Sequence, residues 1–260
     1  MAVTNFIQEV WSKKIQDDLE LKCKLVDNCT REYEGDCKFA RTVKILGVGE
    51  PTIGDYTGAD IEIEEMSDRG QLLTIDQQKY FAFYVDDVNE AQSVPGLPEK
   101  YQEKAVHGLA VARDTYVATL IASATNKTTI DELTAEGARE AVDAAIVALR
   151  ERNFDEDGVI EMTPAFYNLF KHWLITTSTN NPELIKKGVV GMYDNFECIM
   201  SNNLKTPCDI RGRKAIAFAG QINEVEALRA EKKFKDIIRG LDTFGAKVID
   251  EARIQVLATA

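Results

Sequence analysis

The chain has 260 residues, and its 45% hydrophobic and 28% charged residues are the balance of a globular protein, which excludes a mostly disordered chain. Its 31 basic and 43 acidic residues give a net charge of -12 at neutral pH. Proteins that grip nucleic acid gain affinity by replacing phosphate counterions with Lys and Arg. The charge therefore argues against sequence-specific DNA binding and favours a surface that repels packed DNA.

The sequence also bears on the location of the protein. No stretch of about 18 consecutive apolar residues predicts a membrane-spanning helix. Glu9 falls where a secretory signal peptide would have its apolar core. We therefore expect a protein that matures in the cytoplasm and has no membrane partner.

The first part of the chain predicts a helix followed by a long β ribbon. Apolar residues recur at helical spacing through residues 1–25. Residues 42–49 combine β-branched side chains with glycines, residues 60–65 alternate strictly between polar and apolar, and residues 72–85 form another extended segment. The middle of this ribbon has few large apolar side chains. It cannot stabilise itself, and we expect it to lie on another surface.

The longest predicted helix covers residues 99–124. Its predicted apolar seam, at spacings of four and three, consists of Ala105, Leu109, Ala112, Tyr116 and Leu120. Before this helix, Asp86 and Asp87 are expected to open a short helix, with Glu90 placed as a capping box requires.

Two further helices are predicted on either side of a short strand. Thr134 is placed to cap the first helix, whose apolar seam is Ala138, Val142, Ala145, Ile146 and Leu149. Residues 158–162 predict the strand. Thr163 and Pro164 then supply an N-cap and a proline in the first helical position. The buried side of this second helix is predicted to be Tyr167, Phe170 and Leu174.

The last third of the chain predicts mainly strands. Residues 188–200 alternate as a strand with glycine breaks, and residues 214–219 predict another strand. Residues 224–238 are ambiguous, because their propensity favours a helix while their spacing also suits a ribbon closing on residues 246–249. The whole chain predicts an α+β fold with strands on either side of helices in two subregions.

Two loop motifs lack the ligands that their chemistry requires. Residues 49–54 have the glycine spacing of a phosphate-binding loop, but Asp55 and Tyr56 follow where Lys and Ser or Thr are needed. Residues 153–157 resemble the start of a calcium loop, but Pro164 occupies the position of the bidentate glutamate. Neither motif predicts a binding site.

No arrangement of titratable residues predicts catalysis or metal binding. The pair Asp86–Asp87 is explained by the helix cap, and Glu64 and Glu65 would point to opposite faces of a strand. His107 and His172 have no nucleophile motif beside them. The five cysteines form no CxxC pair, which favours reduced, structural thiols; they are Cys23, Cys29, Cys37, Cys198 and Cys208. We expect no enzyme activity, no metal and no cofactor.

Four segments of the sequence stand in a particular order. Residues 52–58 (TIGDYTG) are followed by residues 76–88 (DQQKYFAFYVDDV), by residues 188–204 with GVVG and SNNL at their ends, and by residues 215–248 with AIAFAGQ and FGAKV. In this order they resemble the major capsid proteins of tailed bacteriophages, which have the Hong Kong 97-like fold. The resemblance covers roughly residues 42–257.

The resemblance implies a division of the chain into four parts. Residues 1–41 would be the N-terminal arm, and residues 42–85 an extended loop that rests on a neighbouring subunit. Residues 86–127 and 215–260 would form the peripheral domain around the long helix, and residues 128–214 the axial domain, where five or six copies meet. This reading favours a ribbon over a helix near Phe234.

The resemblance also implies the function and the partners. The chain would assemble through pentamers and hexamers into an icosahedral shell that encloses double-stranded DNA without sequence-specific binding, with separate scaffolding, portal and decoration proteins as further partners. The shell would assemble in the host bacterial cytoplasm and become the virion capsid. Contacts between subunits are expected from the extended loop, through Thr52, Ile53, Gly54, Asp55, Tyr56, Gly58, Glu64 and Arg69.

Two alternatives stay open at this point. An encapsulin-type protein nanocompartment resembles the same fold, and a cargo-loading groove would favour it. A cytosolic α+β enzyme belongs to another class, and a chain that stays monomeric and turns over a substrate would favour that class.

Overall fold

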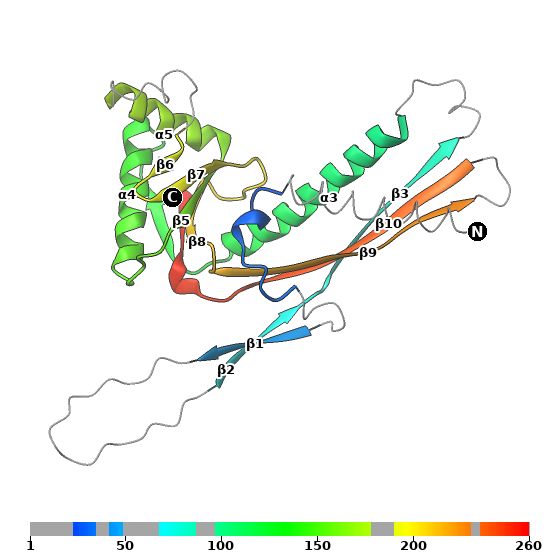
Figure 1. Cartoon of the computed structure of the whole chain (residues 1–260). Helices are drawn as coiled ribbons and strands as arrows, with labels where there is room; N and C mark the ends of the chain where they lie inside the picture. Colours follow the sequence, from blue (N-terminus) through cyan, green and yellow to red (C-terminus); the bar gives the residue numbers. More distant parts are fainter. Residues whose placement is uncertain are drawn as a thin grey trace, which may run out of the picture.

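The structure is a computed structural model, which describes residues 23–34, 42–48, 68–86, 97–177, 190–229 and 235–259. Within these residues the strands form three separate sheets, of two, three and six strands. Figure 1 shows the six-stranded sheet with two helices at one side, a long helix along the three-stranded sheet at the other, and a two-stranded ribbon that projects away. None of the described helices is long and apolar enough to cross a membrane.

The three-stranded sheet is antiparallel, with the order β3-β10-β9. Its strands are β3 (Gln77–Asp86), β10 (Lys235–Val248) and β9 (Ile216–Arg229). The ribbon reading of the ambiguous segment is confirmed, because its described residues belong to β9 and β10. The predicted short helix is wrong at its first residue, since Asp86 ends strand β3, while residues 87–90 lie outside the described part of the chain.

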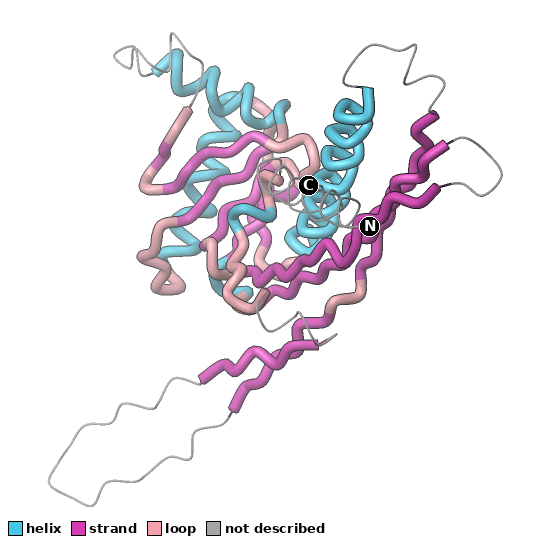
Figure 2. Tube along the Cα trace, turned by 45° about the vertical axis from the view of Figure 1, so that its right-hand side comes forward, coloured by secondary structure: helices cyan, strands magenta, loops and turns pink. Residues whose placement is uncertain are grey.

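Helix α3 (Leu97–Ala122) lies along one face of this sheet, as Figures 1 and 2 both show. The long helix was predicted correctly, but its seam was not. Of the predicted seam only Leu109 is buried, and the other members are partly exposed. The buried side consists of Val106, Leu109, Ala110, Val117, Ala118 and Ile121. The stripe of alanine and aromatic residues beside it was mistaken for the core because both stripes have helical spacing.

The six-stranded sheet has the order β4-β11-β8-β5-β7-β6. Its strands are β4 (Lys127–Ile130), β11 (Ile254–Thr259), β8 (Cys208–Gly212), β5 (Gly158–Met162), β7 (Phe196–Met200) and β6 (Met192–Tyr193). The pairs β4–β11 and β5–β7 are parallel, and the others are antiparallel. The predicted strand at residues 158–162 is confirmed and is buried along its whole length.

Helices α4 (Ala135–Arg150) and α5 (Pro164–Thr177) belong to the core of this sheet. The Thr134 hydroxyl accepts a hydrogen bond from the Gly137 backbone N–H, which confirms the predicted cap. All five residues of the predicted α4 seam are buried. On α5, Phe166 and Phe170 are the buried pair, whereas Tyr167 and Leu174 pack only partly against the core.

The projecting ribbon pairs β1 (Thr42–Val48) with β2 (Asp68–Thr74) in antiparallel register. The predicted extended segment 72–85 is therefore two strands in two sheets, because β2 ends at Thr74 and β3 begins at Gln77. The predicted strand at residues 188–200 is likewise two strands, β6 and β7, separated at Asp194 and Asn195, whose backbones have positive φ. The predicted helix over residues 1–25 is wrong at residues 23–25, which are not helical. Residues 1–22 of that prediction, and the predictions for residues 49–67, lie outside the described residues.

Two short 3-10 helices complete the described structure, η1 (Val26–Asn28) and η3 (Glu251–Arg253). One core cluster lies around α3 and the three-stranded sheet, and a second lies around α4, α5 and the six-stranded sheet. Strand β11 contributes Ile254 and Val256 to the first cluster and Leu257 to the second. It belongs to the six-stranded sheet, although the expected division of the chain gives residues 215–260 to the peripheral domain.

Candidate subunit interface

The eight residues predicted to contact other subunits lie almost entirely outside the described residues. The exception is Arg69, whose backbone lies in β2 opposite Gly47. The predicted role of these residues therefore stays a prediction.

The base of the projecting ribbon is anchored in the subunit itself. Val43, Ile45 and Leu73 pack against Ala217 and Ala219 of β9 in a small separate core. The side-chain amide of Gln71 donates a hydrogen bond to the backbone carbonyl of Ile249 at 2.8 Å. These contacts fix where the ribbon leaves the subunit. Residues 49–67, beyond Val48, are the part expected to reach a neighbour.

A second feature is the segment Cys23–Thr30, which lies between α3 and the six-stranded sheet. The Asp114 carboxylate of α3 accepts hydrogen bonds from the backbone N–H groups of Lys24, Leu25 and Val26, at 3.1, 3.1 and 3.3 Å. Asp114 is 1% exposed, so these bonds form away from water, where they gain strength. One buried carboxylate therefore fixes the start of the described N-terminal segment on the long helix.

The other side of the same segment is held by Arg211 of β8. Its guanidinium donates to the backbone carbonyls of Asn28 and Leu25 at 2.7 and 2.9 Å. It also donates to the Glu161 carboxylate of β5. The side-chain amide of Asn28 donates to the same carboxylate at 3.0 Å. The segment is thus hydrogen-bonded to both cores of the molecule.

Asp209 gives this cluster a second buried carboxylate. It lies opposite Glu161 in the β5–β8 register, and its nearest approach to Arg211 is 3.6 Å. Both of its carboxylate oxygens are buried without a hydrogen-bond partner. Burial, and then the negative charge of Glu161, raise the pKa of Asp209 well above its usual value. Two carboxylates that share one guanidinium in this way favour one negative charge and one neutral acid.

A third feature is the face of the three-stranded sheet that points away from α3. Phe83 and Phe244 point towards the helix, where their rings contact Tyr101 and Tyr116. Side chains alternate along a strand, so their neighbours point the other way. Phe81 packs partly against the core on the α3 side, and its ring lies beside its strand partner Gly240, where an added Cβ atom would be 2.5 Å from the ring.

The open face consists of side chains from all three strands. Its exposed members are Tyr80, Ala82, Tyr84, Leu228, Arg239 and Leu241, and Glu226 is partly buried beside Arg239. Tyr80 is 80% exposed and Tyr84 64% exposed. Large apolar or aromatic side chains that gather on one face usually mark an interaction surface. Among the described residues, no element covers this face.

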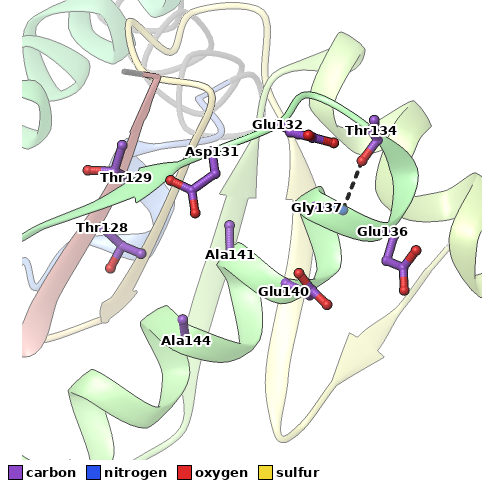
Figure 3. A pocket seen from close by; sticks show the side chains of 10 residues that line it. All are labelled: Thr128, Thr129, Asp131, Glu132, Thr134, Glu136, Gly137, Glu140, Ala141 and Ala144. Atoms are coloured by element: carbon purple, nitrogen blue, oxygen red, sulfur yellow. Dashed lines mark hydrogen bonds between the residues drawn. The ribbon is translucent and has the colours of Figure 1, made fainter.

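Figure 3 shows a different hollow, a groove of about 400 Å³ between β4 and the start of α4. Four carboxylates line it, those of Asp131, Glu132, Glu136 and Glu140. Within the part of the chain that the structure describes, no group of three or more His, Cys, Asp or Glu residues is arranged to hold a metal ion. The groove is an acidic surface beside strand β4, which lies at the edge of its sheet.

The other residues singled out in the sequence do not come together. His107 and His172 are exposed on α3 and α5, in different parts of the molecule. Asp155 and Asp157 are exposed in the turn before β5. Cys37, Asp87, Glu64 and Glu65 lie outside the described residues.

The described cysteines are free and have the environment of structural thiols. Burial raises the pKa of Cys23 to about 12, and burial followed by the charge of Asp114 explains this direction. Burial also raises the pKa of Cys29 to about 11 and that of Cys198 to about 12. Thiols with such values hold little of the thiolate that nucleophilic attack or metal binding needs.

Sequence reasoning missed the Arg211, Glu161, Asp209 and Asp114 cluster entirely. Glu161 and Asp209 are charged residues inside strands that are buried along their whole length. Charged residues in such short apolar strands were the available signal, because they are rarely buried without a partner. Arg211 lies 50 residues from Glu161 in the sequence, and Asp114 lies 89 residues from Leu25.

No protein-family model matches the sequence, and no curated protein matches it either. Solved structures do match the fold. A structure from Mycobacterium phage Che8 has a TM-score of 0.79 and 26% sequence identity, with 90% of each chain covered. The capsid structure of cyanophage P-SCSP1u has a TM-score of 0.71 at 16% identity, covering 85% of this chain and 84% of that one. A virus-like particle from Pyrococcus furiosus has a TM-score of 0.63 at 14% identity, covering 96% and 99%.

These matches confirm the predicted fold class and the predicted resemblance. The chain has the α+β, Hong Kong 97-like fold of tailed-phage major capsid proteins, and it matches along nearly its whole length. The matches also support a structural shell protein.

Proposed function

We propose that this chain is a major capsid protein whose copies assemble through pentamers and hexamers into an icosahedral shell around double-stranded phage DNA. The observation that carries the proposal is the match to the phage Che8 structure over 90% of both chains. In this proposal the chain has a structural role and catalyses no reaction.

Two features of the isolated subunit support assembly. The two-stranded ribbon projects from the body, with only its base packed on β9 (Figure 1). The open face of the three-stranded sheet leaves two tyrosines exposed. Both become buried surface if copies pack around a symmetry axis, as closed oligomers require.

We assign each part of the chain the role that the resemblance implies for it. Residues 42–85 include the ribbon that would lie across a neighbouring subunit. Residues 128–214 contain α4 and α5 and would surround the symmetry axis. The long helix α3 and strands β9 and β10 would form the peripheral domain, which shares strand β11 with the six-stranded sheet of the axial part.

The charge of the chain fits a container for DNA better than a DNA reader. A net charge of -12 opposes tight, sequence-specific contact with phosphates. In this proposal the DNA is enclosed and not read. Separate scaffolding, portal and decoration proteins would be the other partners, and assembly would take place in the host bacterial cytoplasm before the shell becomes the virion capsid.

The test is assembly of the full-length protein with and without the ribbon tip. Residues 51–67 are replaced with a short Gly/Ser turn, which leaves β1 and β2 intact and costs little in loop closure. We expect the wild type to form closed shells by electron microscopy, and the variant to keep its circular dichroism spectrum but form no stable shells.

Three outcomes would count against this proposal. A wild type that is monomeric by light scattering at every concentration and salt level would remove its basis. Normal shells from the folded variant would show that the ribbon does not hold subunits together. Cages that carry host protein and no portal would favour the encapsulin-type nanocompartment.

A further inference from the structure

Strand β4 lies at the edge of the six-stranded sheet, and one side of its backbone is unpaired. It pairs with β11 in parallel register, with Lys127 opposite Val256. The Val256 N–H donates to the Asn126 carbonyl at 3.0 Å. In a parallel pair only alternate residues direct their backbone groups at the partner strand, so Thr128 faces β11, while Lys127 and Thr129 face outward. Among the described residues, no other strand pairs with this outer edge.

The groove beside this edge has a floor of small side chains. Gly137, Ala141 and Ala144 line it from α4, at spacings of four and three residues along one side of the helix (Figure 3). Because these residues carry at most one side-chain carbon, the helix leaves room for a chain beside β4. An edge strand with free N–H and C=O groups is a template for pairing with another extended chain. The edge and the groove together fit one extended peptide segment.

The carboxylates of the groove determine which kind of segment fits. Asp131, Glu132 and Glu136 are exposed, and they take part in no ion pair within the described part of the chain. Lys127 does not neutralise them, because side chains alternate along a strand and Ile130 of β4 packs in the core with α4. Lys127 therefore points to the opposite face of the sheet. The groove favours a segment with Lys or Arg side chains.

A second copy of this chain is a poor occupant. Two β4 edges in contact would bring two sets of these carboxylates together, and like charges across an interface repel. The segments outside the described residues are not basic enough either. None of them has a net charge above +1, the value for residues 178–189 and 230–234. We therefore expect the occupant to be a different polypeptide.

We propose that the free edge of β4 and the groove beside α4 bind an extended segment of a separate protein, with Lys or Arg at alternate positions, as a further strand of the six-stranded sheet. The backbone groups of Lys127 and Thr129 would pair with the segment, and its basic side chains would reach Glu132 and Glu136. The four residues of β4 span about 13 Å, which suits a short segment. This inference goes beyond the proposed shell function, and it concerns a groove within one subunit.

The test is binding of a fluorescein-labelled peptide, TKVKVKVT, to the full-length protein, measured by fluorescence anisotropy. The control peptide TKPPKPKT has the same length and the same number of lysines. Its prolines occupy both odd and even positions, so neither side of it can donate a full set of backbone hydrogen bonds. We expect it to bind at least about tenfold more weakly, the loss typical of two missing hydrogen bonds. Raising the salt concentration should weaken binding of both peptides.

Two variants of the protein test the site itself. Glu132→Gln/Glu136→Gln should weaken binding of TKVKVKVT at least about fivefold. Its matched control is Asp155→Asn/Asp157→Asn, which removes two exposed carboxylates from another turn and should change binding less than about twofold. Thr129→Pro removes an outward N–H and keeps the groups that face β11, so it should weaken binding about fivefold. Circular dichroism checks that each variant is folded, and the glutamine variant decides the matter if Thr129→Pro is not.

Several results would overturn the inference. Equal binding of the two peptides would mean that the negative charge of the protein alone attracts them. Equal binding by the wild type and the folded Glu132→Gln/Glu136→Gln variant would place the peptide elsewhere. A wild-type dimer that Thr129→Pro converts to a monomer would show that a second copy occupies the edge. If no peptide binds while shells assemble normally, this inference fails and the proposed function stands.

Discussion

Asp209→Asn should change the pH dependence of stability in a way that an ordinary surface aspartate does not. Asp209 is fully buried, and both of its carboxylate oxygens lack a hydrogen-bond partner. Burial, and next the charge of Glu161, raise its pKa well above the usual value. The folded subunit therefore holds a proton that the unfolded chain releases above the ordinary pKa of about 3.9.

This difference in proton binding decides whether the free energy of unfolding rises or falls with pH. The stabilisation from a raised pKa is fully present below the ordinary value and is lost as the pH rises towards the raised one. Over that range the free energy of unfolding of the wild type falls by about 1.4 kcal/mol for each pH unit, relative to a protein without the group. Asparagine has no such proton. The gain of Asp209→Asn over the wild type should therefore grow by that amount per pH unit.

The measurement is urea unfolding of the unassembled full-length subunit, followed by circular dichroism at several values between about pH 5 and about pH 7. Asp155→Asn is the matched control, because Asp155 is exposed, and its curve should run parallel to the wild type. Parallel curves for Asp209→Asn as well would mean that Asp209 is ionised in the folded subunit, and the reasoning about the shared guanidinium would be refuted.

Three further predictions concern the same region of the molecule. Arg211→Met should lower the free energy of unfolding by about 3–5 kcal/mol, because it leaves the Glu161 charge buried without its partner; denaturant titration measures this, and a loss below about 1 kcal/mol would contradict it. Asp114→Ala should lower the free energy of unfolding by about 2–4 kcal/mol, since two buried backbone N–H groups lose their acceptor. Asp114→Asn keeps one acceptor oxygen and should lower it less. Cys29 should resist alkylation in the folded subunit and react on unfolding, as mass spectrometry would show, because burial raises its pKa to about 11.

Much of the fold could be predicted from local patterns. Thr134 and Pro164 predict the starts of α4 and α5, because helix capping involves only a few neighbouring residues. The α4 seam was correct because small and large apolar residues recur on one side and charged residues occupy the other. The strand at residues 158–162 was recognisable from its β-branched and apolar composition and its bounding turn.

The errors arose where partners are distant in sequence. The segment 72–85 is extended throughout, and nothing local shows that it leaves one sheet at Thr74 and enters another at Gln77. The seam of α3 was displaced because both stripes of the helix carry apolar residues, and only the position of the sheet decides which is buried. Arg211 meets its carbonyl partners across more than 180 residues, so no window of the sequence could reveal it.

The buried charges of Asp114 and Arg211 hold the segment Cys23–Thr30 in its position. Apolar contacts between α3 and the six-stranded sheet alone would tolerate small sliding movements, because the hydrophobic effect has no direction. Asp114 and Arg211 instead bind backbone groups of Leu25 from opposite sides, and such bonds weaken steeply when their angles change. A segment held by directional bonds to both cores therefore fixes their relative position more firmly than packing alone does. The desolvation cost of the buried charges is then a cost of geometric specificity.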